Sequence, residues 1–185
     1  MEALRGLGVQ MVEMQLPALP YAEVAGTIIA AEGSAVFEPL ISSGRVEQLA
    51  DQKQIAGLKA GLEIPAKDYL RAMRIRSTIC DELGQLFANV DVLVSPSCFS
   101  TATKIDAPLD DSPGPAAAVK PRGLSDLGAA GNLAGLPALS LPCGFAEGLP
   151  VALQLVGRPF SENTVLALGV EFQKRTDWHR RRPKA

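Results

Sequence analysis

The clearest pattern along the chain is a helical repeat between residues 64 and 87, where apolar side chains recur in steps of three and four. Tyr69, Met73 and Leu83 follow this repeat, whereas Arg71 falls on the opposite side. Such a pattern predicts a long amphipathic helix with one stripe facing a core. Shorter apolar or periodic segments bounded by turn or capping residues predict further helices over residues 20–33, 46–60, 125–134 and 162–174.

Extended segments are predicted between these helices. Residues 9–16 and 91–95 each have the pattern of a short strand ended by proline. Residues 137–144 and 149–157 are separated by a short glycine-containing turn and predict a hairpin. Because both hairpin strands are apolar at nearly every position, we expect them to be covered on both faces.

This order of elements predicts an α/β fold: a mixed β-sheet covered by helices on both faces. No repeat or boundary divides the chain, so we expect one domain over residues 1–185. The proline-rich residues 96–123 form a long loop in this interpretation. Loops of that length in compact domains are usually functional or mobile.

Composition supports a globular protein, since 47% of residues are apolar and 21% are charged. The formal net charge is only -2, but six of the last twelve residues are basic and one is acidic. That basic end could contact RNA electrostatically, or it could be a solvated tail that neutralises the C-terminal end of the last helix. We favour the second interpretation and expect no nucleic-acid partner, because no RNA-binding module accompanies the tail.

Cysteine and histidine usage bears on compartment and metal binding. The three cysteines are far apart and odd in number, which argues against a disulfide framework and favours a reducing, cytoplasmic location. With one histidine and three dispersed cysteines, a zinc site is not expected. We also predict no cofactor. We find no signal-peptide pattern and no apolar run near the roughly 18 residues that span a bilayer, so no membrane association is expected.

Four blocks, taken together, resemble the C-terminal region of the amidase-signature family. They are the strand and proline of residues 91–96 after a long helix containing Tyr69 and Arg76, then residues 131–144, 148–157 and 176–183. Their order and spacing match that family across nearly the whole chain, although no single block is specific. The resemblance implies the C-terminal half of the amidase-signature fold.

Members of that family hydrolyse or transfer amide nitrogen. The resemblance implies a serine nucleophile, a second serine on a cis peptide and a lysine, all in a Gly/Ser-rich N-terminal half. The nearest match in this chain is the fragment Ser42-Ser43-Gly44, which we interpret as a surface loop. We therefore expect no catalytic residue here and no activity from this chain alone, with a small amide bound only when the missing half is supplied. The alternative is a non-catalytic interaction module that self-associates or completes a partner chain.

The resemblance also suggests substrate-binding residues. Gly131 and Asn132 fall where the family places a loop near the substrate, although Asn132 could instead bond local backbone. The tRNA-dependent members of the family hold the substrate amino group with an aspartate near this point. By spacing, the matching position in this chain is Ser125. Asp126, the next residue, is a second candidate, although it could instead be a helix N-cap. Gly57 stands where those members use an arginine for the substrate carboxylate, which favours a non-acidic amide.

Three other residues carry two interpretations each. Glu32 could be a buried functional carboxylate, but a paired structural role is favoured. Cys143 could be a nucleophile only with a base nearby, and its place in an apolar hairpin favours core packing. His179 lies in the basic terminal segment, where we expect a surface role.

Overall fold

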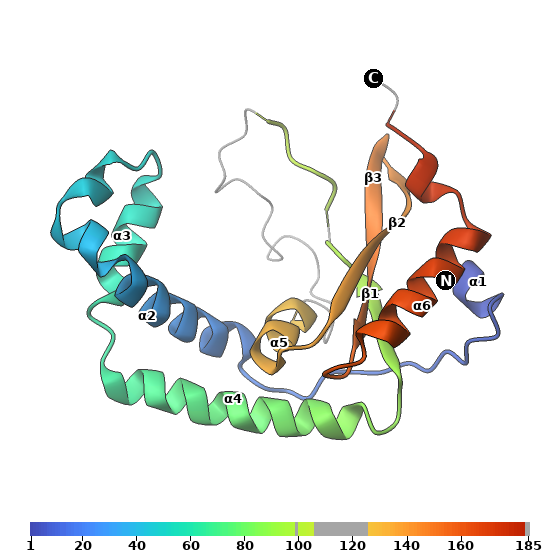
Figure 1. Cartoon of the computed structure of the whole chain (residues 1–185), viewed down its shortest axis with the longest axis horizontal. Coiled ribbons are helices and arrows are strands. Elements are labelled where there is room, and N and C mark those ends of the chain that lie inside the picture. Colours follow the sequence, from blue (N-terminus) through green and yellow to red (C-terminus); the bar gives the residue numbers. More distant parts are fainter. Residues whose placement is uncertain (99, 106–125, 184–185) are drawn as a thin grey trace.

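The computed structural model describes residues 1–98, 100–105 and 126–183, and it confirms an α/β arrangement with helices on both faces of a sheet (Figure 1). Three antiparallel strands pair in the order β1-β3-β2. Their bounds are Val92–Pro96 for β1, Ala138–Ala146 for β2 and Leu149–Gly157 for β3. The expected hairpin is β2 and β3, and β1 lies on the far side of β3.

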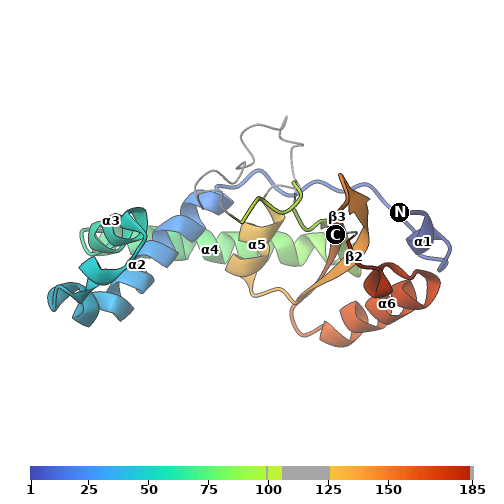
Figure 2. The same cartoon turned by 90° about the horizontal axis from the view of Figure 1, so that it is seen from above.

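Two helices cover opposite faces of this sheet. In both views α6 (Glu162–Arg175) and α5 (Leu127–Ala134) lie on opposite sides of the strands (Figures 1 and 2). Leu153 and Leu155 share a buried cluster with Phe172 of α6. Val156 points to the other face and packs with Leu127 of α5. The alternation of side chains along β3 therefore supplies both contacts, as the double-sided apolar hairpin predicted.

A second buried cluster lies among the helices. Helix α2 (Tyr21–Ser42) packs against α4 (Ala66–Leu86), α3 (Gln52–Gly61) and α5. Tyr21, Val24 and Ile28 of α2 meet Ile79 and Leu83 of α4 in this cluster. The long helix is thus confirmed, with its apolar stripe turned inward as the repeat required.

Several expected elements differ in extent. Helix α2 continues to Ser42 instead of ending at residue 33, through Glu32, which is exposed. The segment expected as one helix over 46–60 is divided into the 3-10 helix η1 (Arg45–Gln48) and α3, because the Asp51 side chain caps α3 by accepting the N–H groups of Lys53 and Gln54. Two short elements were not expected, α1 (Glu2–Arg5) and the 3-10 helix η3 (Trp178–Arg180).

The predicted strand at residues 9–16 is wrong for this chain. The segment carries no helix or strand and pairs with none of the described strands. A strand requires a neighbour for its backbone groups, and the described residues offer none here. The long loop of residues 96–123 lies mostly outside the described residues; residues 97, 98 and 100–105 of it contain no helix or strand.

The greater length of α2 also changes one expectation about membranes. By length and composition alone, α2 is apolar enough to cross a bilayer, and it is the one helix among the described residues that meets both criteria. The sequence pattern did not predict this because the helix was expected to end at residue 33. In the structure α2 packs along α4 as part of a helical cluster.

Candidate functional site

The candidate site centres on α5, whose C-terminal end is fixed by its backbone. Gly135 adopts a left-handed conformation with φ of 64° directly after the helix. The Gly135 N–H reaches the Asn132 carbonyl at 3.4 Å, and the Leu136 N–H reaches the Gly131 carbonyl at 3.0 Å. This pair of bonds is a Schellman motif, which glycine permits at the left-handed position. Gly131 and Asn132 thus owe their placement to the glycine that follows them.

A cation on α4 holds the same end of α5. Arg76 Nε donates to the Leu133 carbonyl at 2.7 Å, and the Cys80 thiol lies 3.8 Å from that oxygen. Carbonyls in the last turn of a helix have no partner within the helix. Arg76 supplies one across the helix–helix contact, so the site is anchored to the long helix.

Asp126 lies at the start of α5, partly buried, and its side chain makes no capping hydrogen bond. The N-cap interpretation of its side chain is therefore not supported. Its charge acts instead on Tyr21, whose hydroxyl donates to the Pro17 carbonyl at 2.7 Å. Burial, followed by the carboxylates of Asp126 and Glu82, raises the pKa of Tyr21 above its usual 10.0.

The other expected substrate residues are only partly placed together. Gly131 is partly buried and Asn132 is exposed, both in the second half of α5, on the helix that Asp126 begins. Ser125 lies outside the described residues. The structure places three of the four candidates on one helix, while their contact with a substrate stays a prediction.

A row of polar side chains that the sequence pattern did not predict crosses the sheet. Gln154 on β3 stands opposite Ser95 on β1 and Ser140 on β2. The Gln154 amide donates to Ser95 Oγ at 3.0 Å, and the Ser97 and Ser140 hydroxyls lie 2.7 Å apart. Because Leu153 and Leu155 face α6, Gln154 points to the face that carries α5. The signal in the sequence was the pair Ser140 and Gln154 interrupting apolar strands.

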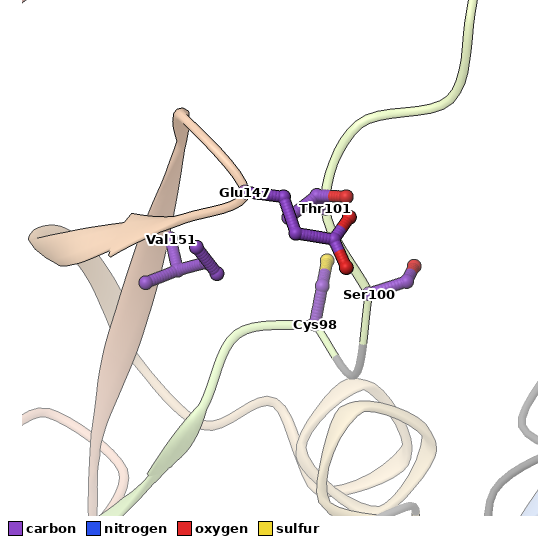
Figure 3. A pocket seen from close by; sticks show the side chains of 6 residues that line it. Cys98, Ser100, Thr101, Glu147 and Val151 are labelled. Carbon is purple, nitrogen blue, oxygen red and sulfur yellow. The ribbon is translucent and has the colours of Figure 1, made fainter. Parts of the chain in front are cut away.

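A shallow pocket of about 350 Å³ lies where the hairpin turn meets the segment after β1 (Figure 3). Cys98, Ser100 and Thr101 line it from the segment, and Glu147 and Val151 line it from the hairpin. Figure 3 shows the Glu147 carboxylate between Thr101 and Cys98. Across the described part of the chain, no three His, Cys, Asp or Glu side chains gather as a metal site would need.

Of the three residues with two interpretations, Glu32 and Cys143 take the structural one, and His179 is less exposed than expected. Glu32 accepts a hydrogen bond from the Tyr69 hydroxyl at 2.9 Å, which is the paired role. Cys143 packs beside the sheet cluster, and burial raises the pKa of its thiol, which makes it a poor nucleophile. His179 is half-buried, and its Nδ1 has no partner among the described residues.

The basic end of the chain is engaged by its own neighbours. The Arg181 guanidinium lies 4.3 Å from the centre of the Trp178 ring and 2.9 Å from an Asp177 oxygen. Arg182 donates to the carbonyls of His179 and Arg181. Two arginines of this end therefore have partners within the end itself, while the choice between a solvated tail and an RNA contact stays a prediction.

Comparison with known proteins places this geometry in context. Residues 1–166 match the family described as Amidase. A glutamyl-tRNA(Gln) amidotransferase subunit of Chloroflexus aurantiacus is 37% identical over 206 aligned positions, covering 99% of this chain and 41% of that protein. The corresponding subunit of Dechloromonas aromatica is 46% identical over 116 positions, covering 62% of this chain and 22% of that protein.

Solved structures show the same fold. A crystal structure of an amidase superposes with a TM-score of 0.78 at 26% identity, covering 94% of this chain and 39% of that one. The 6-aminohexanoate cyclic dimer hydrolase has a TM-score of 0.73 at 17% identity and shares the fold alone. The chain thus spans about two-fifths of the length of the Chloroflexus aurantiacus relative and of the solved amidase.

Proposed function

The chain belongs to the amidase-signature family, and we propose that it forms the C-terminal portion of an amide hydrolase that is inactive by itself. The observation that carries this proposal is the coverage: nearly all of the chain aligns with 41% of the Chloroflexus aurantiacus relative. In this view the chain supplies sheet strands, packing helices and one wall of a substrate pocket, and the nucleophile belongs to the remainder of the domain.

The chemistry of amide cleavage agrees with this division. A serine nucleophile needs a base that removes its proton, and the oxyanion needs aimed N–H donors. The Ser43 hydroxyl donates to the Leu40 carbonyl and accepts from Arg45. Ser95 and Ser97 pair with Gln154 and Ser140. None of these partners is a base that could activate a serine.

The proposed pocket wall combines α5 with the polar row of the sheet. Both lie on the sheet face away from α6, and the row presents neutral hydroxyl and amide groups. Neutral donors and acceptors suit a neutral amide. The family resemblance points the same way, because Gly57 falls where the tRNA-dependent members use an arginine for the substrate carboxylate. We therefore propose a non-acidic amide as the substrate of the complete enzyme, with Asp126, Asn132 and Ser125 beside it.

Hydrolysis assays test the inactivity of this chain. We expect the purified chain to release no ammonia or amine from simple aliphatic and aromatic amides above the buffer rate. The double variant Ser42→Ala/Ser43→Ala, prepared identically, is the control for contaminating hydrolases. Turnover that the wild-type chain shows and the double variant lacks would contradict the proposal, whereas equal turnover in both preparations would identify a contaminating hydrolase.

An interaction module is the second candidate, and the exposed apolar surface favours it. Ile29, Val36 and Phe37, all on α2, are exposed. Contiguous apolar surface on a soluble chain usually marks an interface. Light scattering at micromolar concentration measures the outcome: association supports the module, and a stable monomer that binds no amidase fragment argues against it.

We also propose that the protein works in a reducing compartment such as the cytoplasm. All three cysteines are free thiols in the structure, and Cys98 is exposed. An exposed thiol persists where disulfide formation is disfavoured.

A further inference from the structure

The outer face of α2 carries small and apolar residues from Ala22 to Phe37. Small and apolar residues recur there in steps of four and three: Ala22, Gly26, Ile29, Gly33 and Val36. Ile29 is 66% exposed and Val36 is 72% exposed, and Phe37 beside them is 49% exposed. A helix face turned to water normally carries charged residues. We call these six residues the α2 outer face.

This face is not needed to hold the chain together. The opposite side of α2, through Tyr21, Val24 and Ile28, already buries itself against α4 and α5. A Cβ built on Gly26 or Gly33 would meet no atom within 4 Å. Helix α2 therefore has two apolar surfaces: one is buried against α4 and α5, and the other is the outer face. The two glycines of the outer face leave room for a close neighbour.

Charge distinguishes the possible occupants. Helix α2 carries Glu23, Glu32 and Glu38 and no basic residue. Helices that lie on membranes have lysine and arginine along their polar side, so an anionic bilayer is disfavoured. A second copy pairing through the same face would bring like charges together, which costs free energy. The remaining fit is a different polypeptide with an apolar surface and basic residues around it.

The length of the relatives identifies that polypeptide. Solved amidases with this fold contain the same helices and strands as 39% of a longer chain, so most of their structure has no counterpart here. We propose that the α2 outer face is the surface on which the remainder of an amidase-family domain packs, through an apolar segment with a basic rim. This inference rests on the proposed function and assigns its contact surface.

The probe is the part of the Chloroflexus aurantiacus relative that lies outside the region matched by this chain, purified separately, shown by circular dichroism to be folded, and titrated against the full chain. The wild-type chain is expected to bind, and more weakly as salt rises. Ile29→Glu/Val36→Glu should lower the affinity about tenfold or more, because it places unpaired charges in the contact. Gly33→Leu should also weaken binding, although it makes the face more apolar, because it fills the space a close neighbour needs.

The matched control is Leu166→Glu/Val170→Glu, which places the same charges on α6, where these residues are 53% and 51% exposed. It should bind as wild type does. Circular dichroism of all variants checks that they fold. Stronger binding by Gly33→Leu would reveal a nonspecific apolar patch and overturn the proposal.

Three other results would also overturn it. The first is no binding by the wild-type chain, and the second is an equal loss of affinity in the α6 control. The third is a dimer of the chain, or a complex of the chain with lipid vesicles, that Ile29→Glu/Val36→Glu disrupts. The proposed function fails differently, through amide turnover by the isolated chain. If the complex forms and the α2 substitutions do not change its affinity, the proposed function is unaffected and only the proposed contact surface is wrong.

Discussion

At the scale of single residues, Arg76 links the candidate site to the core. Its guanidinium on α4 donates to the Leu133 carbonyl at the end of α5. The Cys80 thiol is a weaker and longer donor to the same oxygen. The partly buried side chain of Arg76 therefore joins α4 to α5, the helix that carries the candidate residues.

Replacing Arg76 with methionine tests this anchor. The Leu133 carbonyl would lose its strong donor, and we expect Arg76→Met to lower the free energy of unfolding by about 1–3 kcal/mol. Arg74→Met is the matched control, since Arg74 is exposed on the same helix, and it should change stability by no more than about 0.5 kcal/mol. Urea unfolding measures both, and equal effects would show that the bond does not anchor α5.

The two tyrosines make a second test at this scale. The hydrogen bond to Glu32 raises the pKa of Tyr69 above 10.0, and burial raises that of Tyr21. A raised pKa means that the folded chain keeps its phenol protons longer than the unfolded chain does. Folding stability should therefore fall as pH rises beyond about 10, where the unfolded tyrosines ionise first.

Tyrosinate absorbance of Tyr21→Phe isolates Tyr69, because the chain has only two tyrosines. Its midpoint should lie above 10.0 and move down toward that value when Glu32→Ala is added, since the carboxylate is the main cause of the shift. Glu38→Ala, an exposed change on the same helix, should leave the midpoint unchanged. A midpoint insensitive to Glu32 would show that the hydrogen bond does not persist in solution.

At the scale of elements, the sequence predicted those helices and strands whose formation depends on the local pattern of residues. The long helix and the hairpin follow from periodicity and turn residues, and both are confirmed. Residues 9–16 have the pattern of a strand but pair with none of the described strands, so the pattern alone does not make a strand there. The polar row was missed because Ser97 and Ser140 meet only after three strands align. At the site, Asp126 and Asn132 were located on a helix, while the support from Arg76 depends on tertiary packing.

The crossing of α2 and α3 depends on a close approach that pattern does not reveal. A Cβ on Gly61 would lie 2.0 Å from Ser34 Oγ and 2.5 Å from the Ala30 carbonyl. Gly61→Ala should therefore destabilise the chain by about 1–3 kcal/mol through overpacking. Gly57→Ala on the same helix meets open space and should stabilise it by up to about 1 kcal/mol. Thermal unfolding compares them; a neutral Gly61→Ala would mean the helices separate easily.

At the scale of the whole molecule, three buried clusters form a connected path. One joins α2, α4 and α5, and another joins the sheet to α1 and α6. Between them lies a smaller cluster of Leu86, Phe87, Leu127 and Val156, which ties the end of α4 to both α5 and β3. Because this bridge is apolar and buried, we expect the helical and sheet parts to unfold together as one domain.

Probes at the two ends of the molecule test that cooperativity. Trp178 is the sole tryptophan and packs against the sheet cluster, so its fluorescence reports on that part, whereas far-ultraviolet circular dichroism reports mainly on the helices. Both should give one midpoint in urea. Ile79→Ala opens a cavity in the helical cluster, where Ile79 is fully buried, and should cost about 2–5 kcal/mol. Since the bridge couples the clusters, this change should lower the Trp178 midpoint as much as the circular dichroism midpoint. A Trp178 transition that stays in place while the helices melt earlier would divide the chain into two independently folding parts.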